Sequence, residues 1–239
     1  MKAIKTLWVN RLAALGLVVG LTAGFSATSV AQSVAGQAYG TYVNTPVAAS
    51  SQSPLAVLPA ISGTDGDIAY AEADAAGVPG TLSSDFLNST TTGALGATEA
   101  GAQSTATVAD VNILNGLITA SGVIAHVVSS QTANGAVSNA NGSTFENLVV
   151  ASVPVTSGDA AVAPNTNITL PGVGYVVLNE QVPSGDGVSS SGLTVNMIHV
   201  YLQSLVGGIL NPLTGQIIGG TLQTTGEIIV GSATSSVAS

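Results

Sequence analysis

The chain contains no cysteine, and its three basic residues, Lys2, Lys5 and Arg11, all lie within residues 1–11. Without cysteine there is no disulfide framework, so the fold must be held together by its core. Affinity for nucleic acids comes largely from Lys and Arg side chains that neutralise phosphates, and none follows Arg11. Arginine clamps on phosphate or carboxylate groups and lysine Schiff bases are excluded on the same ground. DNA binding and phosphoryl transfer are therefore not expected.

Charged and aromatic residues are also scarce, at 6% and 4% of the chain. Low hydrophobicity together with high net charge typifies disordered chains, whereas the mean hydropathy here is +0.52. A folded protein is therefore expected. With so few aromatics, its core must consist of Val, Leu, Ile and Ala.

The N-terminal segment has the three zones of a secretory signal peptide. A basic stretch, Met1–Arg11, precedes an apolar stretch, Leu12–Ala27, and small residues follow at Ser29–Ala31, with Val34–Ala35 as a second cleavage site. The alternative, an uncleaved membrane anchor, needs about 20 apolar residues, and glycine and polar residues interrupt this stretch. We predict that residues 1–31 are removed and that the protein is exported, to the medium or the cell surface. The remaining chain has no transmembrane segment.

The rest of the chain is typical of an all-β protein. Short runs of β-branched residues alternate with segments rich in Gly, Ser, Thr and Asn, and long helical periodicity is absent. An antiparallel β-sandwich is the predicted fold. A β-solenoid is the alternative, which the lack of a 20- to 50-residue repeat disfavours. We predict one domain, in which residues 32–109 form a less regular N-terminal part and residues 110–239 a β-rich core with a short C-terminal tail.

In the N-terminal part, a first strand is predicted at Ala38–Val43. Ser83–Thr92 is predicted as a polar loop, and Thr98–Val111 as a long strand or a short helix. In the core, Asn115–Gly116 predicts a tight turn, because this dipeptide tolerates positive φ. Phe145–Val153 is predicted as another strand.

The clearest hairpin joins Asn167–Leu170 to Tyr175–Glu180 through Pro171–Gly174, since proline presets φ and glycine accepts positive φ. Leu193–Leu202 is apolar on both faces, which predicts a strand buried between two layers. Glu227–Val230 is predicted as the last strand, before a Ser/Ala tail.

Several of these stretches resemble the bacterial exported proteins called the choice-of-anchor P family. The segments that carry the resemblance are Asp110–Ala120, Gly142–Leu148, Pro171–Gln181, Leu193–Asn196 and Gly226–Ser235. It spans most of the chain, from about Ala38 to Val237. It implies export and residence at the surface or in a matrix, as a shared extracellular domain joined to different C-terminal anchoring tails. It implies no catalytic residues.

The C-terminal region departs from the family where an anchor would lie. Leu222–Gly226 reads Leu-Gln-Thr-Thr-Gly, which resembles a sortase motif without its proline. No apolar span and basic tail follow it, so we predict simple secretion rather than covalent anchoring.

Two histidines and a serine-rich loop are the residues to weigh for a hydrolase triad. A triad needs an exposed serine, a histidine and an orienting acid. Ser189–Ser191 lie in a glycine-bounded loop, but no Gly-x-Ser-x-Gly elbow is present. His126 and His199 lie in apolar strands, and we interpret both as partly buried structural histidines.

Paired carboxylates are the second catalytic possibility. Asn179–Glu180 is similar to the Asn-Glu pair of some glycosidases, and Glu146 could be the second carboxylate that such chemistry requires at a set separation. An extracellular polymer hydrolase is therefore the alternative function. The simpler interpretation places Glu180 at the end of a hairpin strand, facing water.

All 12 Asp and Glu residues follow residue 31, so the exported chain has cations as the only available partners for its acids, apart from His126, His199 and its own N-terminus. The densest acidic cluster is a weak calcium candidate, because calcium binds carboxylate and carbonyl oxygens. The cluster consists of Asp65, Asp67, Glu72 and Asp74. Its spacing fits no EF-hand, and a solvated acidic loop is the competing interpretation.

No motif for catalysis or cofactor binding stands out, so no cofactor is predicted. We predict a non-catalytic structural or adhesive protein of the cell exterior, with extracellular matrix, glycan or further copies of the chain as partners. No nucleic acid partner is expected.

Overall fold

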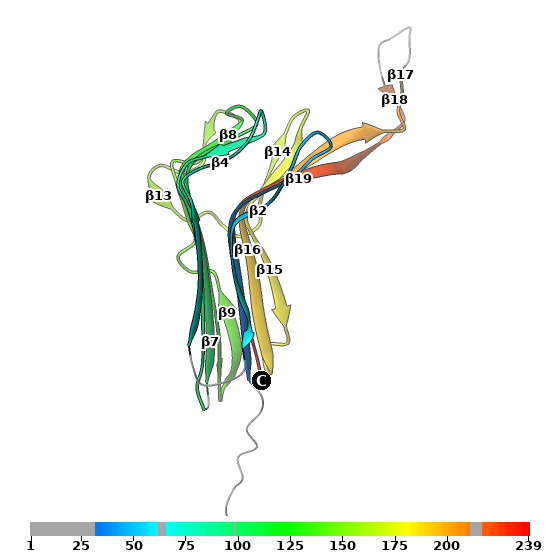
Figure 1. Ribbon diagram of the computed structural model, residues 1–239. Helices are drawn as coiled ribbons and strands as arrows, with labels where there is room; N and C mark the ends of the chain where they lie inside the picture. Colours follow the sequence, from blue (N-terminus) through cyan, green and yellow to red (C-terminus); the bar gives the residue numbers. More distant parts are fainter. Residues whose placement is uncertain (1–31, 62–65, 98, 211–216) are drawn as a thin grey trace, which may run out of the picture.

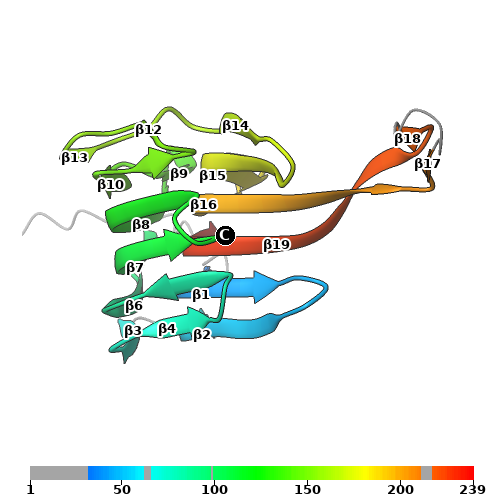
Figure 2. The ribbon, with the colours of Figure 1, turned by 90° about the horizontal axis from the view of Figure 1, so that it is seen from above.

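The protein is a sandwich of two antiparallel β-sheets (Figures 1 and 2), which confirms the predicted fold class. The computed structural model describes residues 32–61, 66–97, 99–210 and 217–239. Within these residues there is no helix, so none that could cross a membrane. The predicted signal peptide, residues 1–31, and the calcium candidate Asp65 lie outside the described residues.

The first sheet has six strands in the order β14-β15-β16-β19-β1-β2. In chain order these are β1 (Ser33–Asn44), β2 (Ala49–Ile61), β14 (Thr166–Leu170), β15 (Gly174–Gly185), β16 (Ser190–Val206) and β19 (Thr221–Ala238). Its centre pairs β19 with both β1 and β16, so the two ends of the described chain lie side by side. The strand predicted at Ala38–Val43 is confirmed as part of β1.

The second sheet has eleven strands, centred on the long hairpin of β7 and β8. They are β3 (Asp67–Ala73), β4 (Ala76–Val78), β5 (Leu82–Ser84), β6 (Leu87–Leu95), β7 (Ala100–Ile113), β8 (Ile118–Thr132), β9 (Gly135–Asn139), β10 (Thr144–Glu146), β11 (Val149–Val150), β12 (Val153–Pro154) and β13 (Asp159–Ala160). The expected boundary between residues 109 and 110 falls inside β7, and residues 32–109 supply strands to both sheets.

The predicted turns are confirmed. Asn115 and Gly116 have φ of 55° and 89° between β7 and β8. The hairpin of β14 and β15 turns at Pro171–Val173, with Gly172 at φ 76°. Of the two interpretations of Thr98–Val111, the strand is correct for its described part.

Three predictions for single segments are wrong. Ser83–Thr92 is not a loop, because its Ser and Thr residues alternate along β5 and β6 with one set buried. Phe145–Val153 is not one strand, because positive φ at Asn147, Ala151 and Ser152 divides it into β10, β11 and β12. The Ser/Ala tail continues β19 to Ala238, since pairing with β1 and β16 supplies its backbone hydrogen bonds.

The apolar core lies between the sheets, and β16 contributes to it in an unexpected way. Both apolar sets of β16 belong to the same core: Leu193, Val195 and Met197, and also Ile198 and Val200. The prediction that β16 is buried between two layers is therefore wrong. The alternation shifts near Met197, where Asn179 on β15 and Gly231 on β19 have positive φ of 49° and 67°. Beyond this shift β16 and β19 bend away from the second sheet (Figure 1).

A layer of hydroxyl groups continues the core. Ser129 Oγ lies 2.7 Å from Ser235 Oγ of the facing sheet and 2.8 Å from Ser138 Oγ. Ser104 donates to the Thr234 carbonyl over 2.6 Å and lies 2.8 Å from Thr91 Oγ1. Such buried hydroxyls satisfy one another, which is what allows them in the interior.

The strands β16 and β19 continue past the sandwich as a two-stranded arm (Figures 1 and 2). We call the described residues 203–210 and 217–226 the arm. Near its tip β17 (Ile209–Leu210) pairs with β18 (Ile217–Ile218). The arm is the only part of the described chain that stands clear of the sandwich in both views.

Candidate functional site

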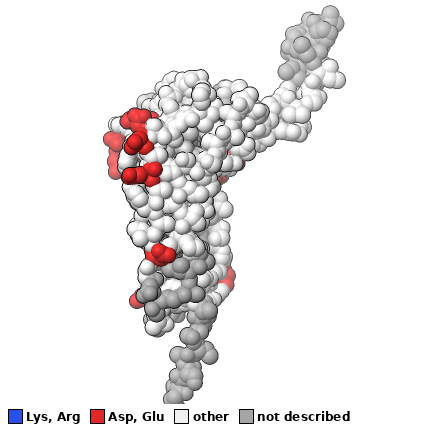
Figure 3. Space-filling model, in the orientation of Figure 1, with Lys and Arg blue, Asp and Glu red and all other residues white. Residues whose placement is uncertain are grey.

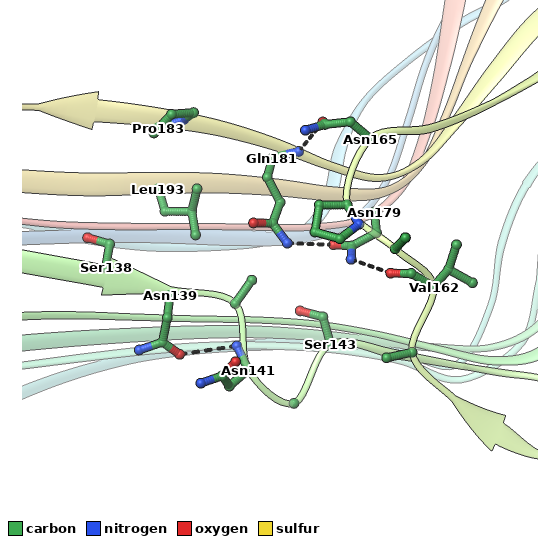
Figure 4. Close-up of a pocket in the computed structure, with 15 residues that line it drawn as sticks. Ser138, Asn139, Asn141, Ser143, Val162, Asn165, Asn179, Gln181, Pro183 and Leu193 are labelled. Atoms are coloured by element: carbon green, nitrogen blue, oxygen red, sulfur yellow. Dashed lines mark hydrogen bonds between the residues drawn. The ribbon is translucent and has the colours of Figure 1, made fainter.

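A groove opens on one side of the sandwich, where β9 of the second sheet faces β15 of the first (Figure 4). It has a volume of about 770 Å³. The lining residues are Ser138–Ser143, Ala161–Asn165, Asn179, Gln181, Pro183 and Leu193. Concave sites of this size with a few convergent polar groups are typical ligand sites.

The groove exists because the chain crosses from one sheet to the other at this point. After β13, residues 161–165 cross to β14 and form one wall. The side-chain Nδ2 of Asn179 donates to the Val162 carbonyl over 2.7 Å. The backbone N–H of Asn165 donates to the backbone carbonyl of Asn179 over 2.9 Å. Both asparagines have positive φ, which asparagine tolerates better than most residues.

The lining carries no charged side chain. Several side-chain amides of the lining are held by hydrogen bonds to other described residues. Asn165 Oδ1 accepts from the Gln181 backbone N–H at 2.9 Å, and Gln181 Nε2 donates to Asn179 Oδ1 at 3.1 Å. Asn139 Oδ1 accepts from the Asn141 backbone at 3.1 Å. Gln181 Oε1, the opposite end of one of these amides, accepts no hydrogen bond among the described residues.

A second polar cluster lies on the outer face of the first sheet, around His199 in β16. His199 Nδ1 lies 2.6 Å from Glu180 Oε2 in β15, and Nε2 lies 3.0 Å from Glu227 Oε2 in β19. Tyr201 donates to Glu180 Oε1 over 2.7 Å, and Asn196 donates to Glu180 Oε2 over 2.8 Å. The shift in β16 near Met197 turns His199 and Tyr201 outward, while Ile198 and Val200 stay in the core.

The electrostatics of this cluster favour an ionised Glu180. Burial opposes the charge, but hydrogen bonds from His199, Asn196 and Tyr201 outweigh it and lower the pKa of Glu180 from 4.5 to about 2. Burial, together with the hydrogen bond to Glu180, raises the pKa of Tyr201 above its ordinary value. Glu180 is therefore unsuited to act as a general acid, which needs a raised pKa.

The structure separates the two carboxylates considered for glycoside hydrolysis. Glu146 lies in β10 on the exposed face of the second sheet, opposite Asp159 of β13, whereas Glu180 belongs to the first sheet. In Figure 3 acidic atoms gather on the second sheet's side of the molecule. The strand registers and the Asp85–Ala109 hydrogen bond place Glu146, Asp159, Asp85 and Asp110 in one row across that sheet.

The other predicted catalytic residues also lie apart. His126 is in the second sheet, where Nδ1 lies 2.6 Å from the Asn141 carbonyl. In the Ser189–Ser191 loop, Asp186 accepts hydrogen bonds from the Ser189 hydroxyl at 2.6 Å and from the backbone of residues 188–190. These bonds hold the pKa of Asp186 below its ordinary value. Neither histidine is among the hydrogen-bond partners shown for this loop.

The described calcium candidates do not converge. Asp67 begins β3, and Glu72 lies five residues further on, about 16 Å along an extended strand, while Asp74 follows the end of β3. Glu72 accepts a hydrogen bond from Tyr70. Among residues 32–239, leaving out the segments that are not described, no group of three or more His, Asp or Glu could hold a metal ion.

Sequence reasoning missed the groove. The sequence does show several uncharged segments rich in Asn, Gln and Ser. They form a site only because the two sheets bring three of these segments together.

Comparison with known proteins found no matching family model, no matching curated protein and no matching solved structure.

Proposed function

We propose that the protein is an exported, non-catalytic structural or adhesive protein whose groove binds an uncharged polysaccharide. The observation that carries this proposal is the groove lining, in which several side-chain amides lie together without any charged side chain. Sugar hydroxyls are both donors and acceptors, and neutral amides match them.

The charge of the chain supports a neutral rather than an acidic polymer. All charged side chains beyond residue 31 are acidic, so the net charge of the protein would repel a uronic acid or sulfated polymer. The resemblance to the choice-of-anchor P family agrees with residence outside the cell. The separation of Glu146 from Glu180 gives no support to the hydrolase alternative.

The test uses isothermal titration calorimetry of residues 32–239 with neutral glucan, galactan and mannan fragments and with a uronic acid polymer. We expect binding to a neutral polymer, weakened at least tenfold by Gln181→Ala and by Asn139→Ala. Asn134→Ala, at an exposed turn outside the groove, is the matched control and should bind like the wild type.

Three results would contradict the proposal. The first is equal binding by the groove variants and the control, and the second is no binding to any neutral polymer. The third is release of reducing ends from a polymer by the wild type and its loss in Glu146→Gln or Glu180→Gln, which would identify a hydrolase.

A further inference from the structure

We propose that the arm is a dimerisation element, which pairs edge to edge with the arm of a second copy of this chain. The proposal deepens the structural role proposed above by naming a partner, but it does not depend on the ligand of the groove.

The backbone of the arm has two open edges. β15 begins at Gly174, opposite Leu202, and β1 ends at Asn44, opposite Glu227. Beyond these points β16 and β19 pair only with each other among the described residues, apart from the hydrogen bond from the Gln203 amide to the Val173 carbonyl. Unpaired strand edges are templates for pairing with another strand.

Four apolar side chains of the arm, Leu205, Val206, Ile209 and Leu222, are exposed. Leu205 and Leu222 are cross-strand partners, and Leu222 is 66% exposed. Ile209, near the tip, is 75% exposed, and Val206 is also exposed. Adjacent apolar side chains that project from a domain mark an interaction surface.

The arm lacks the features by which two edge strands of this protein, β2 and β3, avoid association. The edge strand β2 carries Pro54 and Pro59, and β3 carries Asp67 and Glu72. Proline and charge on edge strands block pairing. No charged residue lies between His199 and Glu227, and the described strands of the arm contain no proline.

A second copy of the chain is a better partner for the open edges and apolar side chains of the arm than a lipid bilayer is. Hydrocarbon cannot satisfy the backbone groups of two open edges, whereas a neighbouring strand can. The protein also has no basic residue beyond Arg11 to attract anionic lipid. Two identical arms related by a twofold axis pair their edges and cover their apolar side chains in a closed dimer, the commonest assembly symmetry.

Net charge explains why the contact would be made by the arm. Copies of a chain whose charges beyond residue 31 are all acidic repel each other. Pairing through an uncharged projection joins the two first sheets into one continuous sheet. It keeps the acidic row of the second sheet, on the opposite side of each sandwich, away from the contact (Figures 1 and 3).

The experiment is sedimentation velocity of residues 32–239 across the micromolar range, at physiological ionic strength. We expect a concentration-dependent dimer. Leu222→Asp and Leu222→Lys should each sediment as a monomer, because each variant places a charge of one sign in the apolar contact of both copies, and an equimolar mixture of the two should restore the dimer. Val188→Asp, at a 71% exposed position remote from the arm, is the control and should dimerise like the wild type. Circular dichroism verifies that each variant is folded.

Three outcomes would overturn the inference. The wild type could remain monomeric throughout, the Leu222 variants could dimerise as the wild type does, or the wild type could bind neutral lipid vesicles while monomeric in solution, which would assign the arm to a membrane. Polysaccharide binding is measured on the Leu222→Asp variant as well. Because the groove does not include the arm, a monomeric variant should still bind polysaccharide, so the two proposals can fail independently.

Discussion

His199 and Glu180 are joined by a hydrogen bond of 2.6 Å between Nδ1 and Oε2, on the outer face of the first sheet. The other ring nitrogen faces Glu227 at 3.0 Å. A neutral imidazole has one N–H, so the ring donates to both carboxylates only when it is protonated. The ring of Tyr201 stacks on it with centroids 3.9 Å apart. The cluster thus ties β15, β16 and β19 together where the sheet bends.

The first prediction concerns acid stability. The pKa of Glu180 is about 2 in the folded protein against 4.5 ordinarily, so the unfolded chain binds more protons between these values. The stabilisation by Glu180 is therefore fully present above about pH 4.5 and is lost as pH falls towards 2. Because the side chain is partly solvated, we expect about 1–2 kcal/mol. Glu180→Gln should remove this pH-dependent part of the free energy of unfolding.

The measurement is urea unfolding of wild type and Glu180→Gln from pH 2 to pH 7. The difference between them should shrink as pH falls below 4.5. Glu99→Gln, in the exposed turn between β6 and β7, serves as the control for loss of one negative charge. A difference that stays constant with pH would show that Glu180 contributes no proton-linked stability.

The second prediction concerns the hydroxyl layer of the core. Ser129 is completely buried, and its hydroxyl lies within hydrogen-bonding distance of Ser235 and Ser138. Ser129→Ala should lower the free energy of unfolding by about 1–3 kcal/mol, because its partners lose a hydrogen bond in a dry interior. Equilibrium urea denaturation at pH 7 measures the loss. Ser83→Ala, at an exposed position of β5, should stay within about 0.5 kcal/mol of the wild type. Equal values for the two variants would mean that water reaches the layer.

The third prediction concerns the close approach of the sheets at Gly36. A Cβ added there would lie 2.0 Å from Thr91 Oγ1 and 2.8 Å from Ser104 Oγ. Gly36→Ala should therefore destabilise by about 1–3 kcal/mol or more, since overpacking forces backbone shifts. Thr91→Ala in the same chain removes the nearest atom and should recover part of the loss.

Thermal unfolding followed by circular dichroism tests this prediction. Gly77→Ala is the matched control, because its nearest neighbour would lie 3.6 Å away, an ordinary contact. If Gly36→Ala alone unfolds at the wild-type temperature, the sheets are less tightly packed at this point than the structure shows. If the double variant is no more stable than Gly36→Ala, the clash is not with Thr91.

The sequence alone determined the fold class, because turn dipeptides such as Asn115–Gly116 and short β-branched runs are local signals that act through backbone conformation. It also determined the charge, since every basic residue lies before residue 12. Local signals failed for Ser83–Thr92 and for the C-terminal Ser/Ala segment. Small polar residues there form strands only because facing hydroxyls and neighbouring strands satisfy them.

Tertiary structure alone decided both the groove and the cluster around His199. Residues 138–143, 161–165 and 179–183 are distant in sequence and meet because the chain crosses between the sheets beside β15. His199 faces outward because the alternation of β16 shifts near Met197, and Glu180 follows the positive φ at Asn179 in β15. A shift by one residue moves every following side chain of a strand to the opposite face of the sheet. The sequence of β16 therefore predicts two apolar faces, whereas the strand has one face in the core and one polar face.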